Sequence, residues 1–183
     1  MASGPDERER DLIIGVTPGA RPDGRLVVGV CRGGGLGVLD LGRDLDRAGD
    51  ELRLVESRYD GPFGVRLGRE IDVDPTALTD HVGVVIVPDA SAVVRWQTGG
   101  RRVLVEVTSV QDAAAAVAAG AAGLIAKGAE SGGRVGEETA FVLLQRLVGQ
   151  VELPLWLQGG IGLHTAAAAI AGGARGVVLD AQL

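Results

Sequence analysis

Eight short apolar segments, separated by polar or Ala-rich stretches, constrain the fold of this chain more than any other feature. Several of them are unbroken runs of Val, Leu and Ile, a pattern typical of parallel strands that are covered on both faces. The alternation therefore predicts an α/β fold with a parallel sheet. The predicted strands are residues 12–16, 37–41, 63–67, 82–87, 103–107, 123–127, 155–158 and 176–179, and the predicted helices are residues 23–32, 44–54, 111–119, 137–148 and 165–171.

The same residue pattern occurs at two of the predicted helix-to-strand junctions. Residues 120–127 read Gly-Ala-Ala-Gly-Leu-Ile-Ala-Lys, and residues 173–180 read Gly-Ala-Arg-Gly-Val-Val-Leu-Asp. In each segment the first glycine suits the left-handed residue that ends a helix, and the second glycine opens a buried strand. The repeat indicates a recurring helix-and-strand unit, and it places Lys127 and Asp180 at the carboxyl ends of their strands.

Eight strands with intervening helices and no antiparallel hairpin predict a (β/α)8 TIM barrel, and the alternative is an open, doubly wound sheet. TIM barrels typically need about 250 residues, whereas this chain has 183 and stops directly after the last predicted strand. We therefore expect a minimal or C-terminally truncated barrel without an eighth helix, formed by residues 11–183 as part of a longer polypeptide. Residues 1–10 are expected to form a disordered tail. The missing helix should leave apolar surface beside the first and last strands, which favours a homodimer or contact with downstream domains.

Charge and composition narrow the expected partners and cellular setting. The net charge of −6 argues against nucleic acid and against an anionic membrane surface as partners. No apolar run reaches the ~18 residues of a spanning helix, and the amino terminus has no signal-peptide pattern. One cysteine and two histidines exclude a disulfide within the chain and a multi-cysteine or His-rich metal site. We expect a cytoplasmic protein without a metal, with a small molecule as its ligand.

Glycine-rich segments mark the predicted functional end of the barrel. In TIM barrels this end is the mouth formed by the carboxyl ends of the strands. Glycines at a strand end let backbone N–H groups approach an anion such as a phosphate, and the alternative is that they only make tight turns. The segments predicted at the mouth are residues 32–37, 127–136 and 158–162, and the glycines predicted to bind the cofactor are Gly34, Gly35, Gly132, Gly133, Gly159 and Gly160.

These segments also carry a resemblance to a known family. Residues 126–133 (Ala-Lys-Gly-Ala-Glu-Ser-Gly-Gly), 158–161 (Gln-Gly-Gly-Ile), 173–178 and 33–38 together resemble the nitronate monooxygenase family, which includes 2-nitropropane dioxygenase-like proteins and flavin-dependent enoyl-acyl-carrier-protein reductases. The resemblance implies an FMN-binding TIM barrel that oxidises or reduces a small or acyl-chain substrate. The chain also resembles barrel regions at the front of some bacterial multidomain polyketide synthases, which implies synthase domains as partners.

The chain departs from the family pattern at three places. Arg134 stands where members usually have a histidine base, and arginine stays protonated at any working pH. Arg66 stands where members often have asparagine. Asp180 and Ala181 stand where members usually have Gly-Thr, which helps hold the FMN phosphate, and a carboxylate there repels a phosphate dianion. The resemblance thus predicts a flavin barrel with a degenerate catalytic site and weakened FMN binding.

The candidate catalytic residues are Lys127, Glu130 and Arg134. Lys127 is the only lysine and is placed where barrel enzymes carry Schiff-base lysines; its alternative is a salt bridge to Glu130 or Asp180. Glu130 either orients a ligand hydroxyl or caps the next helix. Arg134 either binds an anion or is solvated. Glu106 faces either the mouth or the outside of the barrel. Three functions stay open: a flavin oxidoreductase, a catalytically silent docking module of a polyketide synthase, and a Lys127-dependent aldolase-like enzyme.

Overall fold

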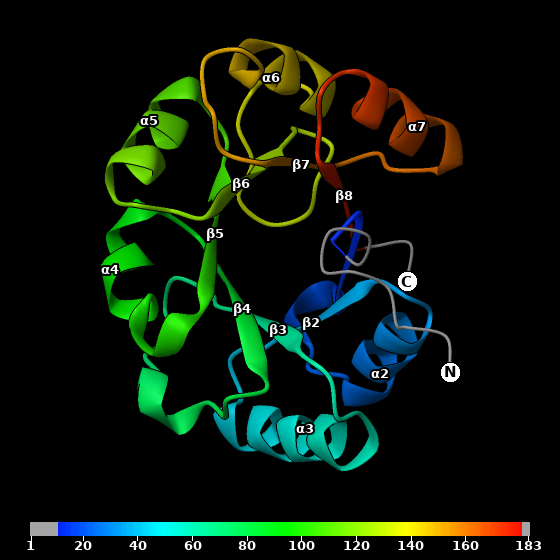
Figure 1. Cartoon of the computed structure of the whole chain (residues 1–183), viewed down its shortest axis with the longest axis vertical. Coiled ribbons are helices and arrows are strands. Elements are labelled where there is room, and N and C mark those ends of the chain that lie inside the picture. The colour runs from blue at the N-terminus through cyan, green and yellow to red at the C-terminus, as the bar shows by residue number, and fades with distance from the viewer. Residues whose placement is uncertain (1–10, 181–183) are drawn as a thin grey trace.

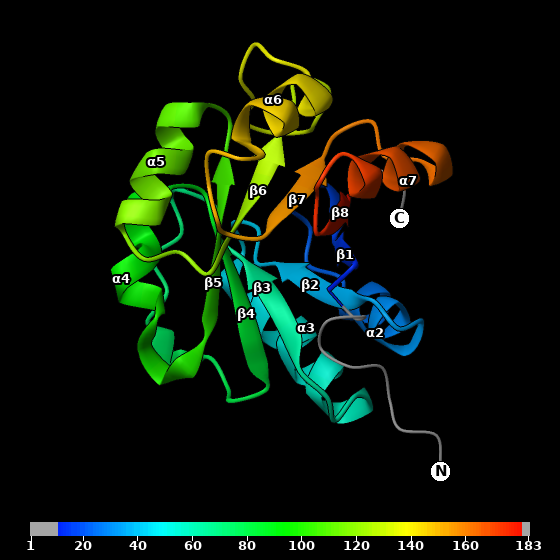
Figure 2. The same ribbon diagram turned by 45° about the horizontal axis from the view of Figure 1, so that its top comes forward.

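Eight parallel strands follow one another in chain order around a closed barrel in the computed structural model (Figures 1 and 2). The structure describes residues 11–180, so the predicted tail over residues 1–10 and Ala181 lie outside it. The ring closes where β8 pairs in parallel with β1, which confirms the TIM barrel and excludes the open sheet. The strands are β1 (Ile13–Val16), β2 (Leu36–Asp40), β3 (Phe63–Arg66), β4 (Val82–Val87), β5 (Arg102–Val107), β6 (Gly123–Lys127), β7 (Leu155–Gln158) and β8 (Gly176–Leu179).

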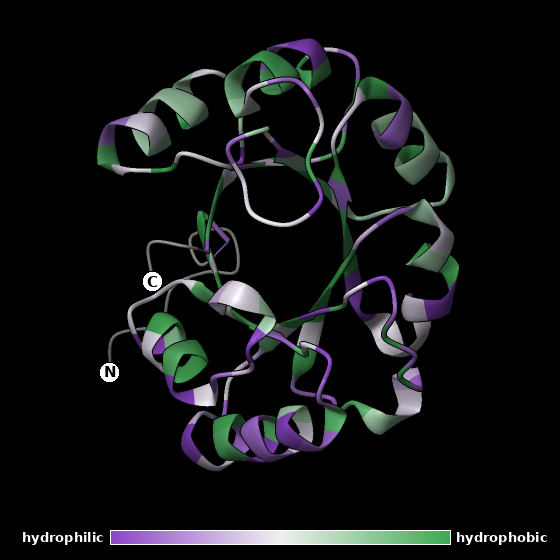
Figure 3. Ribbon diagram, turned by 180° about the vertical axis from the view of Figure 1, so that it is seen from behind, coloured by the Kyte–Doolittle hydropathy of each residue, from purple (hydrophilic) through white to green (hydrophobic). Residues whose placement is uncertain are grey.

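Side chains alternate between the inside and the outside of the barrel along each strand, because successive strand residues point to opposite faces. In β4, Val84 and Ile86 belong to the cluster that fills the barrel, whereas Val85 and Val87 pack outward under the helices. Both faces are therefore covered, which explains the unbroken apolar runs; Figure 3 shows hydrophobic residues along the strands and hydrophilic ones on loops and outer helix surfaces. The interior cluster consists of Ile14, Val16, Leu36, Val38, Val84, Ile86, Leu104, Ile125, Trp156 and Val178.

Helices lie around the barrel and alternate with the strands. Asp23, Asp44 and Ser109 directly precede three of them and accept hydrogen bonds from N–H groups of the first turn. The connection after β3 contains only the short 3-10 turn Pro75–Ala77. Within residues 11–180, no helix is long and apolar enough to cross a membrane. The helices are α2 (Gly24–Arg32), α3 (Leu45–Arg58), α4 (Val93–Trp96), α5 (Val110–Ala118), α6 (Ala140–Leu147) and α7 (Leu163–Ala171).

The two repeated junctions have the conformation that their glycines predict. Gly120 and Gly173 have φ angles of +84° and +100°, in the left-handed region that commonly ends a helix. The second glycines leave no room for a side chain: a Cβ on Gly123 would lie 2.6 Å from the ring of Trp156. A Cβ on Gly176 would lie 2.4 Å from the carbonyl oxygen of Leu12. The repeat therefore reflects both helix ends and close strand packing.

The outer side of β1 and β8, between α7 and α2, is not covered by any helix of the described residues (Figure 1). Leu12 and Ile13 are 37% and 48% exposed there. Together with Val30 and Leu179 they line a hollow of about 330 Å³. Apolar surface is thus present beside the first and last strands, as expected from the sequence.

Replacing Trp156 tests the packing of the barrel interior. Its indole is fully buried, and Nε1 donates a 2.6 Å hydrogen bond to the carbonyl oxygen of Asp11. Trp156→Ala leaves a cavity and an unpaired carbonyl, so we expect the free energy of unfolding to fall by about 3–5 kcal/mol. Chemical denaturation measures the loss. The control is Leu163→Ala, at a side chain 85% exposed, where we expect a change within about 0.5 kcal/mol; equal losses in the two variants would contradict the prediction.

Candidate functional site

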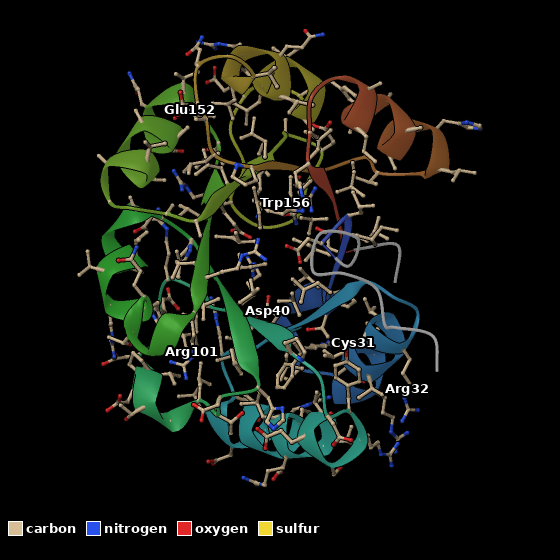
Figure 4. The ribbon with its side chains drawn as sticks, in the orientation of Figure 1. Cys31, Arg32, Asp40, Arg101, Glu152 and Trp156 are labelled. Atoms are coloured by element: carbon tan, nitrogen blue, oxygen red, sulfur yellow. The ribbon has the colours of Figure 1, made fainter. Side chains whose placement is uncertain are left out.

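A layer of charged and polar side chains lies inside the barrel at the carboxyl ends of the strands. Five of these residues follow an interior apolar residue by two positions, and Arg66 follows Gly64, so the strand alternation directs all six side chains inward. Lys127, for example, follows Ile125, and Asp40 follows Val38. Figure 4 labels Asp40 and Trp156, both inside the ring of strands. The members of the layer are Asp40, Arg66, Glu106, Lys127, Gln158 and Asp180.

Arg66 is the centre of a network of ion pairs across this layer. Its Nε and Nη2 donate to the two carboxylate oxygens of Glu106 at 2.7 and 3.1 Å. Its Nη1 donates to Oδ2 of Asp40 at 2.5 Å. One guanidinium therefore joins β2, β3 and β5, and the pairing with Glu106 has the two-pronged geometry that arginine forms with carboxylates.

Lys127 joins the network from β6 by a longer contact. Its Nζ lies 3.4 Å from Oε2 of Glu106, and the side chain is only 1% exposed. The predicted salt bridge therefore exists, but its partner is Glu106 and not Glu130 or Asp180. Glu106 itself is buried and faces the mouth, which decides between the two orientations that the sequence left open.

The network shifts the proton affinities of its members. Burial alone would raise the pKa of Glu106, but the hydrogen bonds and charge of Arg66, with a smaller effect from Lys127, hold it below its ordinary value. Burial alone would lower the pKa of Arg66, but Glu106 and Asp40 hold it above its ordinary value. Burial lowers the pKa of Lys127, and the charge of Arg66 lowers it further, while Glu106 and Asp180 oppose the shift in part. Glu106 and Arg66 are therefore firmly charged. Of the two cations in the network, Lys127 loses its proton more readily.

The remaining members of the layer have polar partners of their own. Asp40 accepts a hydrogen bond from the N–H of Gly42 through Oδ1, and its own N–H donates to Thr17 Oγ1. Gln158 Nε2 donates to Oδ2 of Asp180 at 2.7 Å. The layer is thus an arrangement of paired groups, as burial of polar side chains requires.

Two adjoining hollows open above the layer, with volumes of about 300 and 370 Å³. Both are lined by Asp40, Arg66, Lys127 and Gly133. Together they reach the size of a small-molecule site. Arginines lie around the rim of the first hollow, namely Arg43, Arg69 and Arg134.

The other two predicted catalytic residues, Glu130 and Arg134, do not join the ion-pair network of Lys127. Both carboxylate oxygens of Glu130 accept from the N–H of Ala140, at 3.0 and 3.2 Å, so this side chain caps α6. Arg134 stands at the rim, where its Nη2 lies 3.3 Å from Oδ2 of Asp112 and its Nη1 lies 3.5 Å from the Pro88 carbonyl oxygen. The structure thus confirms the helix-capping alternative for Glu130 and leaves Arg134 loosely held beside the mouth.

The glycines predicted to bind the cofactor fall into three places. Gly132 and Gly133 line the second hollow beside Lys127. Gly159 and Gly160 lie under the side chains of Glu130 and Ser131: a Cβ on Gly159 would be 2.7 Å from Ser131 Oγ. Only the first pair therefore lines the hollows, although Gly159 and Gly160 directly follow β7 at the same end of the barrel.

The predicted position of Gly34 and Gly35 is wrong. They precede β2, so they lie at the amino-terminal end of the barrel, where they line the outer hollow beside β1. A residue that precedes a strand lies at the amino-terminal end of the barrel, and the mouth is at the opposite end. In the described part of the chain, no group of three or more His, Cys, Asp or Glu side chains is placed to hold a metal ion.

The sequence analysis missed Asp40 as a site residue and treated Arg66 only as a departure from the family pattern. The alternation of the strands carried the missing signal. Counting in steps of two from Val38 and Val178 leads to Asp40 and Asp180, the polar residues at the ends of β2 and β8. Because every second residue of a strand points inward, this count identifies the polar layer once one inward residue of each strand is known.

Replacing Arg66 tests whether the network stabilises the barrel. Arg66→Met leaves Glu106 buried without its main partner, so we expect a loss of about 3–5 kcal/mol in the free energy of unfolding at neutral pH. Arg43→Met is the matched control, because Arg43 and its partner Glu70 are 85% and 78% exposed, and we expect a change below about 1 kcal/mol.

The same variant has a defined pH dependence. Because the pKa of Glu106 is lowered in the folded protein, its stabilising contribution is present above the pKa of the unfolded chain and disappears as the pH falls through the lowered value. The difference between wild type and Arg66→Met therefore shrinks in acid. A difference that stays constant down to acid unfolding would show that Glu106 is not the group responsible.

Several known structures are similar to this barrel. FabK from Thermotoga maritima is 28% identical with a TM-score of 0.84, over 93% of this chain and 58% of that one. Nitroalkane oxidase from Streptomyces ansochromogenes is 24% identical with a TM-score of 0.76, over 91% of this chain and 64% of that one. Thiamine phosphate pyrophosphorylase from Pyrococcus furiosus shares the fold, with 20% identity, a TM-score of 0.69, and coverage of 96% and 88%. The chain thus spans about three fifths of the FabK and nitroalkane oxidase chains.

Sequence comparison identifies the family directly. A comparison with curated proteins gives no match. The model of the nitronate monooxygenase family matches residues 68–183, a range that begins just after β3 and includes β4 to β8. This match covers more than half of the chain, includes the loop with Gly132 and Gly133, and confirms the resemblance found in the sequence. The chain belongs to the nitronate monooxygenase family.

Proposed function

We propose that this chain is a flavin barrel of oxidoreductase lineage that binds FMN weakly at its mouth and lacks the base of its family. The network of Arg66, Asp40, Glu106 and Lys127 is the observation that carries the proposal. It fills the end of the barrel, where TIM-barrel enzymes hold their substrates and cofactors, with buried charges that are already paired.

One end of the mouth fits a phosphate group. Gly132 and Gly133 line the hollow, and Lys127 Nζ lies 3.7 Å from the position that a Cβ on Gly133 would take. Within residues 11–180, the backbone N–H groups of these two glycines donate no hydrogen bond. Unpaired N–H groups beside a cation are a suitable surrounding for a phosphate.

Acidic groups nearby oppose the same phosphate. Asp180 and Asp40 line the same hollow as Gly132 and Gly133. The carboxylate of Glu130 lies against Gly160, which removes the second glycine pair from the site. Like charges about 4 Å apart repel by roughly 1–4 kcal/mol at the dielectric constants of water and of a protein surface. This repulsion supports weak FMN binding.

The hollows at the mouth also lack a histidine that could act as the family's base. The side chains that line the two hollows include no histidine, cysteine or tyrosine among the described residues. Arg134 contacts Asp112 and remains a cation. Bound FMN would supply electron transfer, and the residues of this chain would supply contacts to its phosphate and positive charge at the rim, but no histidine base for a nitroalkane or an acyl-chain substrate.

Titration with FMN, followed by quenching of flavin fluorescence, tests the proposal. We expect weak binding by the wild type and at least about tenfold tighter binding by Asp180→Asn, because the substitution removes the charge and keeps the shape. Asp80→Asn, at an exposed position just before β4 at the opposite end of the barrel, is the control without effect. Adding Arg134→His to Asp180→Asn should be required before a nitronate is oxidised.

Two outcomes would overturn the proposal. Tight FMN binding by the wild type would show that Asp180 does not weaken the phosphate site. No binding by either the wild type or Asp180→Asn would favour a barrel that has lost the flavin entirely and acts as a silent docking module.

A further inference from the structure

We propose that Lys127 is a nucleophilic amine that forms an imine with a small oxo-carboxylate entering the mouth. The proposal concerns an activity without flavin, so it does not rest on FMN binding. It depends on three features of the described residues. The amine of Lys127 lines the hollows, the charge of its neighbour Glu106 is already balanced by Arg66, and arginines lie around the rim.

The amine lies at the floor of both hollows. Lys127 is inside the barrel at the end of β6, it lines each of the two hollows, and its side chain is almost fully buried. A carbonyl compound that enters either hollow therefore meets Nζ without leaving the mouth. A lysine in such surroundings is a nucleophile once it is neutral.

Lys127 is the weakest partner in its ion-pair network. Glu106 accepts hydrogen bonds of 2.7 and 3.1 Å from Arg66, whereas its distance to Lys127 Nζ is 3.4 Å. The charge of Glu106 is thus already balanced by Arg66. Loss of a proton from Lys127 leaves that carboxylate paired, so the neutral amine is compatible with the network.

The charged groups around Lys127 favour release of its proton. Burial and the positive charge of Arg66 lower its pKa, and the negative charges of Glu106 and Asp180 raise it by less. Asp40, the other carboxylate that lines the hollows, is itself paired with Arg66. A larger fraction of Lys127 is therefore neutral near pH 7–8 than of an ordinary lysine.

The rim provides groups that suit a carboxylate. Arg134 is 44% exposed, and both of its protein contacts are long, so its guanidinium can turn toward a ligand. Gly132 and Gly133 line the same mouth, on the loop that follows Lys127. A planar carboxylate beside an oxo group matches a guanidinium at the rim and an amine at the floor.

The imine forms without oxidation or reduction. The lone pair of neutral Nζ forms a bond to the carbonyl carbon, and one of the two Nζ protons passes through water to the carbonyl oxygen to give a carbinolamine. The second Nζ proton then passes to the same oxygen, the C–O bond breaks, and one water leaves as the C=N bond forms. One oxo-carboxylate and one amine thus give one imine and one water, and no oxidant or reductant takes part.

Reductive trapping tests the proposal on the full chain. Glyoxylate and, separately, pyruvate are incubated with the protein and cyanoborohydride, and the adduct is located by mass spectrometry of peptides. The chain has a single lysine, so an adduct on a lysine-containing peptide identifies Lys127 directly, and the only other amine is the amino terminus. We expect labelling of Lys127 at pH 7.5 at least about tenfold faster than labelling of free Nα-acetyl-lysine.

Variants and a neutral carbonyl separate this activity from nonspecific labelling. Lys127→Arg keeps the positive charge and should leave only amino-terminal labelling. Arg134→Gln should slow labelling by glyoxylate severalfold and leave labelling by acetaldehyde unchanged, because only glyoxylate carries a carboxylate. In the wild type, the rate should rise with pH around a midpoint below that of Nα-acetyl-lysine.

Two results would overturn the inference. One is labelling of Lys127 no faster than that of Nα-acetyl-lysine. The other is a wild-type pH midpoint equal to that of the free amino acid. Both measurements use the wild-type chain, so they remain decisive even if a variant fails to fold, and neither depends on whether FMN binds.

Discussion

The pairing of Arg66 with Asp40 and Glu106 is the interaction on which the mouth of this barrel depends. A closed barrel directs every second side chain inward, and a charge placed there loses most of its water. Three carboxylates and two cations share that layer, so each needs a partner within reach. The guanidinium, with five donors in a fixed plane, holds two carboxylates from different strands at once. Because these charges are paired, the mouth stays polar without unfolding the strands that carry it.

The same network limits the chemistry of the site. Family members are expected to hold a flavin at this end of the barrel, whereas here the interior layer is occupied by charges that contact one another. Arg134 contributes a positive charge at the rim. What remains available is a hollow with N–H groups of two glycines, rim arginines and one buried amine. These groups suit the binding of an anion.

The interior layer also explains why sequence reasoning found Lys127 but placed its partner wrongly. The repeated Gly-Ala-x-Gly segment located Lys127 and Asp180 at strand ends, and this is where they lie. Nearby residues in the chain, such as Glu130, seemed natural partners. The closed ring instead brings Glu106, from the preceding strand, to Lys127 and directs Glu130 to the first N–H of α6. The glycine-rich composition of residues 32–37 predicts a place at the mouth for Gly34 and Gly35, but a turn before a strand lies at the other end of the barrel.

The sequence alone determined the eight strands, their parallel arrangement and the glycines at two helix ends, because these follow from apolar periodicity and from backbone conformations that only glycine adopts readily. It also determined that position 134 carries no base, since that is a property of the residue type. Tertiary structure alone decided which polar side chains meet. The hydrogen-bonded partners of the network are 21 to 40 positions apart in the chain; they are Asp40, Arg66, Glu106 and Lys127. They meet only because the alternation of side chains along each strand directs all four into the same layer of a closed barrel.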